Sequence, residues 1–274
     1  MTPPVSVTLP QFHPDGTPLV DAARRAEALG FTGVFLFDHL YPLDGPKRPV
    51  VELFAALGAV AAATSLIRVG SLVARATTRP PDATASGVAA VQAVSGGRMV
   101  AGLGAGDTAS KGEMDAYGLA FPPFEERLET LRRTIVAIRQ LEDDGLTTPP
   151  VWVGGRHRRV REVAAEQGDG WNAWGADPGA LAAEASEVWR AASRHITISW
   201  GGAVFVATDP AHLTAFIEKR GGSQGIIAGI PEEVASRLGA LLEAGADELV
   251  LSLLPSSEPF PTWELFVERV WPLL

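Results

Sequence analysis

The sequence contains no cysteine. This absence excludes disulfides, thiolate catalysis and metal sites with sulfur ligands. Basic residues are also in the minority: 23 lysines and arginines face 32 acidic residues, for a net charge of −9. A chain with this balance is not expected to bind a nucleic-acid backbone in general, so any anion-binding site must be local.

Long apolar runs are missing as well. The longest, around Leu53 to Ala63, is rich in alanine and too short to span a bilayer. The first four residues have neither a basic n-region nor an apolar h-region, so we expect no secretory signal. These features favour a cytoplasmic enzyme or binding protein without membrane partners.

The chain does contain a regular alternation of short apolar runs with longer stretches of helical periodicity, which is typical of βα units. The runs predict eight strands, at Val5–Leu9, Gly33–Phe37, Ile67–Ser71, Met99–Leu103, Val151–Val153, Gly170–Ala173, Ile196–Ala207 and Glu248–Leu253. The other stretches predict helices at Leu19–Leu29, Val50–Thr64, Asp82–Val94, Phe124–Leu141, Arg158–Gln167, Pro178–Ala192, Pro210–Lys219, Pro231–Ala244 and Thr262–Val270.

Eight consecutive units favour closure into a (β/α)8 TIM barrel over an open, doubly wound sheet. The length of 274 residues is usual for one such barrel. No linker, low-complexity tract or internal repeat divides the chain, so we expect residues 1–274 to form a single α/β domain. Active sites of such barrels gather at the C-terminal ends of the strands, and residues there are the first candidates.

Asp38 and His39 directly follow the second predicted strand. A histidine can give or take a proton near neutral pH, and an adjacent carboxylate can orient a ring or accept hydrogen bonds from a ligand. A pair that only caps a turn is the competing interpretation. The position at a strand end supports a functional role, and both interpretations remain open.

Two glycine-rich stretches also follow strands. Gly104 and Gly106 come where the fourth strand ends, and they would let the backbone approach a planar or anionic ligand while Asp107 reaches the barrel mouth. A plain glycine turn explains this stretch equally well, and its spacing is not that of a dinucleotide fingerprint.

The second glycine stretch, Gly154-Gly155-Arg156, follows the fifth strand and precedes a predicted helix N-terminus, which makes it a plausible phosphate cradle. Three further arginines, Arg158, Arg159 and Arg161, crowd next to it in an otherwise acidic protein. We favour anion binding over a solvated basic helix face, because the cluster stands beside two glycines at a strand end.

The remaining candidates give weaker signals. Ser71-Leu72-Val73 closes the third strand, and a buried strand end is its default interpretation. Trp171 and Trp174 flank the sixth strand, and we expect them to pack in the core and not to face a cofactor. The histidines other than His39 lack metal-ligand spacing, so we expect no metal site.

Together these stretches resemble the bacterial luciferase-like superfamily, particularly its deazaflavin (coenzyme F420)-dependent oxidoreductases. The resemblance covers nearly the whole chain. It rests on the order and spacing of Ala22–Phe31, Phe37–His39, Gly97–Met99, Gly104–Asp107, Pro150–Gly155, Glu166–Trp171, Pro231–Val234 and Ala244–Asp247.

The resemblance implies a role for each candidate. Asp38 would hydrogen-bond the deazaflavin ring and His39 would stand beside its reacting carbon. Ser71-Leu72 matches a bulge that often holds a non-prolyl cis peptide, with Val73 beside it against the ring. Asp107 stands where relatives carry a catalytic glutamate. The cofactor phosphate would lie at Gly154-Gly155, assisted by Arg156.

Two departures from the family pattern stand out. The stretch between Leu141 and Val151 is short, so a hairpin insertion usual in the family is missing. The region Gly221–Gly229 is glycine-rich and compact where larger relatives build substrate walls. We therefore expect a more open pocket, or one completed by a second subunit of a homodimer.

The favoured hypothesis is hydride transfer between F420 and a small organic substrate, with His39 or Asp107 handling the proton. The Asp-His pair favours F420 over FMN. The alternative is an FMN-dependent monooxygenase in which the reduced flavin activates oxygen. A third possibility is a flavin-binding barrel without turnover, against which the presence of His39 speaks.

Overall fold

The computed structural model describes residues 2–12, 17–42, 48, 50–143, 145–255 and 259–274. The strands are β1 (Val5–Thr8), β2 (Gly33–Leu36), β3 (Arg68–Ser71), β4 (Ala74–Arg75), β5 (Met99–Gly104), β6 (Val151–Gly154), β7 (Gly170–Trp174), β8 (Thr197–Val206), β9 (Ile226–Gly229) and β10 (Glu248–Leu254). The helices are α1 (Thr17–Ala28), α2 (Leu53–Ala63), α3 (Pro81–Val94), α4 (Lys111–Ala116), α5 (Phe124–Gln140), α6 (Arg158–Gln167), α7 (Pro178–Ala191), α8 (Pro210–Arg220), α9 (Pro231–Glu243) and α10 (Pro259–Arg269), with short 3₁₀ turns at Thr108–Ser110 and Trp271–Leu273.

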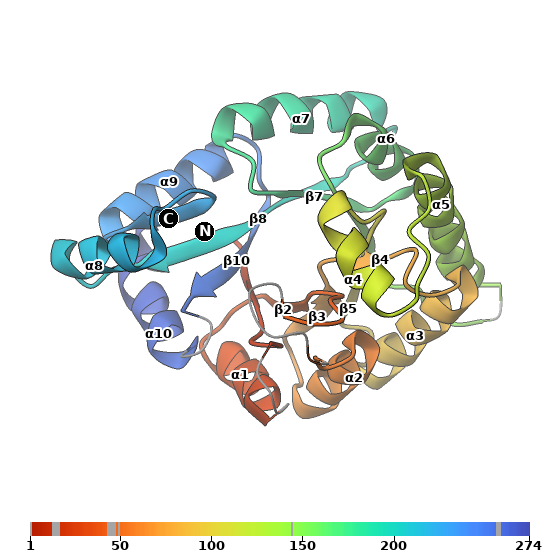
Figure 1. Cartoon of the computed structure of the whole chain (residues 1–274), viewed down its shortest axis with the longest axis horizontal. Coiled ribbons are helices and arrows are strands. Elements are labelled where there is room, and N and C mark those ends of the chain that lie inside the picture. The colour runs from red at the N-terminus through yellow and green to blue at the C-terminus, as the bar shows by residue number, and fades with distance from the viewer. Residues whose placement is uncertain (1, 13–16, 43–47, 49, 144, 256–258) are drawn as a thin grey trace.

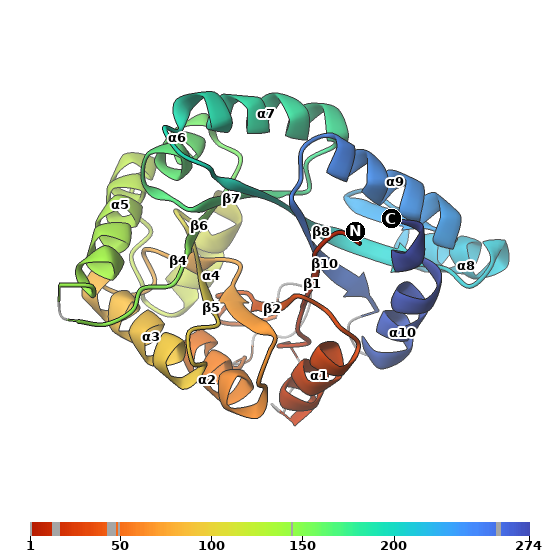
Figure 2. The same ribbon diagram turned by 180° about the vertical axis from the view of Figure 1, so that it is seen from behind.

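Eight parallel strands close into a ring. The hydrogen-bonded order runs β10-β1-β2-β3-β5-β6-β7-β8, and β10 also pairs with β8 over Glu248–Leu254. Figures 1 and 2 show the ring from its two ends, with the longer helices around its outside. The predicted (β/α)8 barrel and its eight main strands are therefore confirmed.

The barrel interior is filled by a few large side chains. Phe35 of β2 stacks on Trp152 of β6, with ring centroids 5.6 Å apart, although the two strands are not neighbours in the sheet. The strands next to them carry glycine where these rings need room. A Cβ at Gly70 would lie 2.6 Å from the Phe35 ring, and one at Gly170 would lie 2.4 Å from the Trp152 ring. Large residues facing small ones pack the centre of the ring as a core and leave no pore.

Three elements were not predicted. The two-residue strand β4 pairs with the end of β5, and β9 pairs with the second half of β8 outside the ring, at Ala203–Val206. The strand β9 occupies the last four residues of the glycine-rich region Gly221–Gly229, for which no strand was predicted. The helix α4, with the 3₁₀ turn before it, lies over the C-terminal rim (Figure 1).

Within the part of the chain that the structure describes, no helix has both the length and the apolar character needed to cross a bilayer.

Candidate active site

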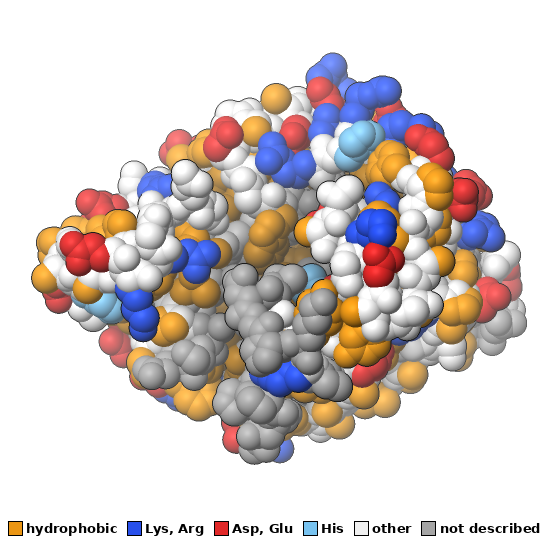
Figure 3. Space-filling view, in the orientation of Figure 1, with side chains coloured by type: hydrophobic (Ala, Val, Ile, Leu, Met, Phe, Trp, Pro, Cys, Tyr) orange, Lys and Arg blue, Asp and Glu red, His pale blue; other side chains and the backbone are white. Residues whose placement is uncertain are grey.

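A pocket of about 540 Å³ lies at the C-terminal ends of β2 to β7. Of the residues to which the family resemblance assigns a role, all except Ser71 line this pocket. Its walls are formed by Phe37, Asp38, His39, Leu72, Val73, Arg75, Gly104, Ala105, Gly106, Asp107, Ser110, Phe124, Gly154, Gly155, Arg156, His157, Val160, Asn172 and Trp174. Figure 3 shows this face of the molecule, with apolar side chains visible in the hollow near its centre.

The bulge after β3 forms one wall. Its non-prolyl cis peptide joins Leu72 to Val73, one bond later than the predicted Ser71-Leu72 position. Ser71 itself is buried behind the wall, where its hydroxyl donates to the Gly102 carbonyl at 2.7 Å. The expected strand-end bulge is therefore present, but Leu72 and Val73 are the residues that face the pocket.

The glycines at the ends of β5 and β6 make room for Val73. A Cβ at Gly104 would lie 2.5 Å from Val73 Cγ2, and one at Gly154 would lie 2.5 Å from Val73 Cγ1. Such contacts are too close for any side chain, so both positions require glycine. The next residue, Gly155, has a φ of +130°, which also favours glycine. Packing of the wall explains Gly104 and Gly154 without a ligand.

His39 lies in the pocket against a buried acid from α4. Its Nδ1 is 3.1 Å from Glu113 Oε2, and the Glu113 side chain is only 4% exposed. The same carboxylate accepts hydrogen bonds from the Arg75 guanidinium at 2.7 Å and from the backbone N–H groups of Leu40 and Tyr41. Burial raises the pKa of Glu113, but the hydrogen bonds from His39 and Leu40 and the charge of Arg75 lower it by more, to about 2.

Glu113 was missed in the sequence because α4 has only six residues, too few to show a helical period. The only local signal was the i, i+4 pair of Lys111 and Asp115, which is exposed and uninformative about the site.

Asp38 is held in place by arginines. Its two carboxylate oxygens accept hydrogen bonds from Arg79 at 2.9 and 3.1 Å, and one of them also accepts from the Arg75 backbone N–H. Burial lowers the pKa of Arg79, but hydrogen bonds to Asp38 and Glu52 raise it by more. The Asp38 carboxylate is therefore fixed at the pocket wall before any ligand binds.

Asp107 is exposed at the edge of the pocket and caps the 3₁₀ turn that precedes α4. Its Oδ1 accepts hydrogen bonds from the Ser110 N–H and hydroxyl, both at 3.0 Å. No hydrogen bond joins it to His39 among the described contacts. Its geometry matches a capping residue.

The four clustered arginines are all paired with carboxylates. Arg156 binds both oxygens of Glu184, at 2.9 and 3.0 Å. The other three pairs are Arg158 with Glu162, Arg159 with Glu125, and Arg161 with Glu187. The free positive charge at this end of the pocket is thus smaller than the sequence indicates. The Arg159 N–H at the start of α6 is also occupied, because it donates to the His157 side chain.

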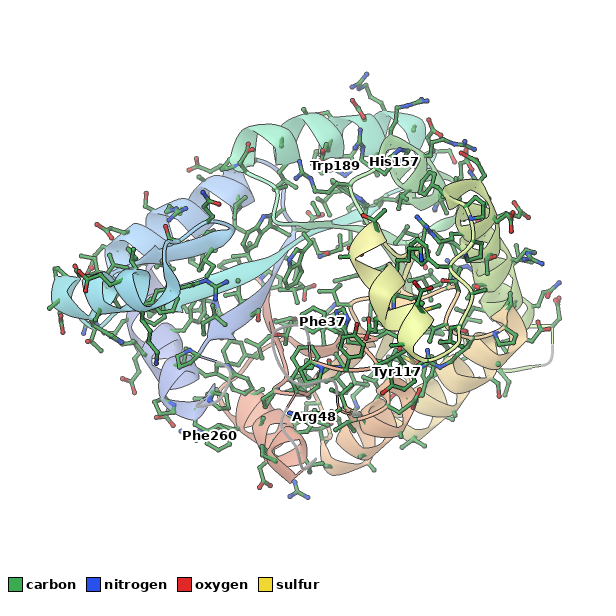
Figure 4. All side chains as sticks on the ribbon, in the orientation of Figure 1. Phe37, Arg48, Tyr117, His157, Trp189 and Phe260 are labelled. Carbon is green, nitrogen blue, oxygen red and sulfur yellow. The ribbon has the colours of Figure 1, made fainter. Side chains whose placement is uncertain are left out.

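Aromatic rings cover the other end. Phe37 contacts His39 with ring centroids 6.1 Å apart, and Trp174 packs edge-on against Phe37 at 5.5 Å. Figure 4 places Phe37 near the centre of the barrel mouth and His157 at its rim, next to α6. Trp174 is 38% exposed, whereas Trp171 is fully buried and donates to the Gly155 carbonyl. The predicted core position is correct for Trp171 and wrong for Trp174.

Among the described residues, no cluster of histidine, aspartate and glutamate side chains has the grouping that a metal ion needs.

Two curated relatives illustrate the sequence similarity. F420-dependent glucose-6-phosphate dehydrogenase from Intrasporangium calvum is 32% identical over 132 residues, which cover 48% of this chain and 39% of that protein. 5,10-Methylenetetrahydromethanopterin reductase from Methanolobus tindarius is 29% identical over 167 residues, 54% of this chain and 47% of that protein. The matched part of this chain spans less than half the length of these relatives.

Solved structures match over almost the whole chain. An F420-dependent secondary alcohol dehydrogenase, in complex with an F420-acetone adduct, superposes with a TM-score of 0.80 at 18% identity and covers 100% of this chain and 99% of its own. Coenzyme F420-dependent tetrahydromethanopterin reductase from Methanopyrus kandleri gives 0.78 at 20% identity, with 99% of both chains covered. An EDTA monooxygenase from Chelativorans gives 0.79 at 15% identity, covering 100% of this chain and 93% of its own. At these identities the likeness shows the fold alone.

The family model described as luciferase-like monooxygenase matches residues 4–220, more than three quarters of the sequence. The resemblance drawn from the short sequence stretches is confirmed at this level, and the chain belongs to the luciferase-like monooxygenase family.

Proposed function

We propose that this protein is an oxidoreductase that transfers a hydride between coenzyme F420 and a small organic substrate. The observation that carries the proposal is one pocket with two chemically different ends. His39 stands at one end between a buried carboxylate and the rings of Phe12 and Phe37, and the Gly154-Gly155 turn stands at the other, at the start of α6. The F420-dependent relatives support the choice of cofactor.

The residues present fit this cofactor. A pocket of about 540 Å³ lies within the usual range for cofactor sites. The side chains of Leu72 and Val73 offer an apolar surface for a flat ring, and the Asp38 carboxylate borders the same wall. The start of α6 suits a phosphate, because the positive end of a helix dipole attracts anions and Gly155, Arg156 and His157 line the pocket there. The Arg159 N–H donates to His157 Nδ1, so a phosphate would have to replace this cap. Arg156 would add a charge only in competition with Glu184.

When bound, F420 supplies a ring carbon that takes up or gives the hydride, and this chain supplies the proton chemistry. We assign the proton to His39, because its ring lines the pocket and Nδ1 already faces Glu113, which leaves Nε2 for the substrate. Asp107 is the weaker candidate, since its carboxylate is exposed and caps a turn. Phe37 and Trp174 would restrict water beside His39.

We further propose that the chain acts as one domain and as a cytoplasmic homodimer. The described pocket-lining residues lie at the ends of β2 to β7 and on the segments that follow these strands, so a second copy can complete the wall on the side of β8 to β10. Light scattering in solution tests this point, and a monomer would contradict it.

The second candidate function is an FMN-dependent monooxygenase. It is considered because the fold is also similar to that of an EDTA monooxygenase. A fluorescence titration of the protein with F420 and, separately, with FMN distinguishes the two. We expect saturable binding of F420 and much weaker binding of FMN. Tight binding of FMN alone would overturn the proposal.

The role of His39 is tested in the same preparation. With F420 bound, reduction of the cofactor is followed with 2-propanol and glucose 6-phosphate as first substrates. We expect His39→Ala to lower turnover about 10²- to 10⁴-fold, the usual contribution of a general acid or base, and to leave F420 affinity nearly unchanged. An unchanged turnover would remove His39 from the chemistry.

A further inference from the structure

The proposed function uses the buried acid of α4 only as a neighbour of His39. Glu113 lies on the helix that covers the C-terminal rim, and its side chain is 4% exposed. A carboxylate so far from solvent is costly unless it is fully hydrogen-bonded, so its partners indicate what it is for.

The hydrogen-bond partners of Glu113 are His39 itself and groups that lie next to it. Oε1 accepts from the backbone N–H groups of Leu40 and Tyr41, the two residues that follow His39. Oε2 meets the His39 ring at Nδ1 and the Arg75 guanidinium at Nη1. One side chain thus holds both the ring and the backbone beside it.

Arg75 stabilises the negative charge of Glu113. The Arg75 side chain is 6% exposed, and among the described residues neither its Nε nor its Nη2 has a hydrogen-bond partner. The ion pair with Glu113 is therefore the main compensation for burying this cation. Four donors around one carboxylate favour its ionised form.

An ionised carboxylate accepts hydrogen bonds and has none to donate. The ring nitrogen that faces it must therefore carry hydrogen, which places the proton of neutral His39 on Nδ1. The free lone pair is then on Nε2. The carboxylate also prevents the ring from turning over without losing this hydrogen bond.

We propose that Glu113 is the positioning residue of His39, which fixes its ring with Nδ1–H toward α4 and Nε2 toward the substrate, and that Arg75 keeps Glu113 ionised for this purpose. The proposal rests on the proposed function only for what His39 does with Nε2. The placement of the ring hydrogen stands on the contacts alone.

The placement is tested without cofactor by long-range ¹H–¹⁵N correlation spectra of the protein labelled with [¹⁵N]histidine. The His39→Asn variant identifies the His39 signals among those of the five histidines. We expect a single neutral tautomer with hydrogen on Nδ1. We expect Glu113→Gln to give a mixture of tautomers, because an amide can donate as well as accept. The matched control is Asp115→Asn, which removes an exposed acid from the same helix and should leave the His39 signals unchanged.

A second measurement uses the F420-loaded protein. We expect Glu113→Gln to lower kcat about a hundredfold, as misplacement of a catalytic group by about 1 Å does, with little change in KM for F420. Glu113→Asp, which keeps the charge, should restore part of the rate and a majority of the Nδ1–H tautomer. A Glu113→Gln spectrum identical to that of the wild type would overturn the inference. Failure of F420 to bind would overturn the proposed function and leave the spectra as the test of Glu113.

Discussion

At the scale of single residues, the site depends on contacts between positions far apart in the sequence, such as those of His39 with Glu113 and of Asp38 with Arg79. Asp38 and His39 were predicted because they follow a strand directly, and both line the pocket. Glu113 was not predictable, because its importance comes from a contact across 74 positions of sequence. Arg156 looked free in the sequence but binds Glu184, a pairing between the β6–α6 loop and α7 that leaves no local sequence pattern.

The free energy of unfolding at acid pH should depend on the titration of Glu113. Its pKa in the folded chain is about 2, below the ordinary value of 4.5, so its contribution to stability is complete above pH 4.5 and is lost as pH falls toward 2. A shift of this size corresponds to about 3 kcal/mol. The free energy of unfolding, measured with urea, should fall less between pH 6 and pH 3 in Glu113→Gln than in the wild type.

Asp115→Asn serves as the control for that comparison, since Asp115 is exposed on the same helix. An equal fall in the free energy of unfolding in the wild type and in Glu113→Gln would show that Glu113 does not titrate as described.

The packing of Val73 against Gly154 gives a second prediction. In Gly154→Ala the new methyl group would lie 2.5 Å from Val73 Cγ1. Overpacking of this kind costs about 1–3 kcal/mol. Val73→Ala removes the obstructing methyls, so the double variant should lose less stability than the sum of the two single variants.

Denaturant unfolding of the four proteins in that cycle gives the coupling energy. Strict additivity would mean that Gly154 is required for another reason, such as approach of the cofactor.

At the scale of elements, periodicity was reliable where an element was long. The long strand predicted at Ile196–Ala207 is β8 (Thr197–Val206), and the nine predicted helices are all present, α6 with the predicted bounds and the others with one or both ends shifted. The elements that were missed are β4, α4 and β9, with two, six and four residues. These short elements are stabilised by pairing with a longer strand or by a buried contact. Such tertiary contacts leave no periodic pattern in a single sequence.

The helix α8 should be the least protected of the outer helices. None of its residues is buried, and its contact with the barrel centres on Phe216, which stacks on Phe205 with centroids 3.6 Å apart. By contrast α9 buries Val234 and Leu238. Amide hydrogen exchange should be faster in α8 than in α9, and Phe216→Ala should speed it further in α8 only. Equal protection of the two helices would show that α8 is covered in solution.

At the scale of the whole molecule, the count of eight strands was enough to predict closure. The ring is completed where β10 pairs with β1 on one side and with β8 on the other. The ten-residue β8 is longer than its neighbour β7, and β9 pairs with the part of β8 that extends beyond it. Closure brings the ends of β2 to β7 to one rim, which is why residues as distant in sequence as His39 and Gly154 share a pocket.

The most direct test is a crystal structure of the protein with F420. We expect the ring to lie against Leu72 and Val73 within hydrogen-bond reach of the Asp38–His39 segment, and the phosphate to lie at Gly155 at the start of α6. A ring bound away from His39, or a phosphate bound away from α6, would contradict the proposed site.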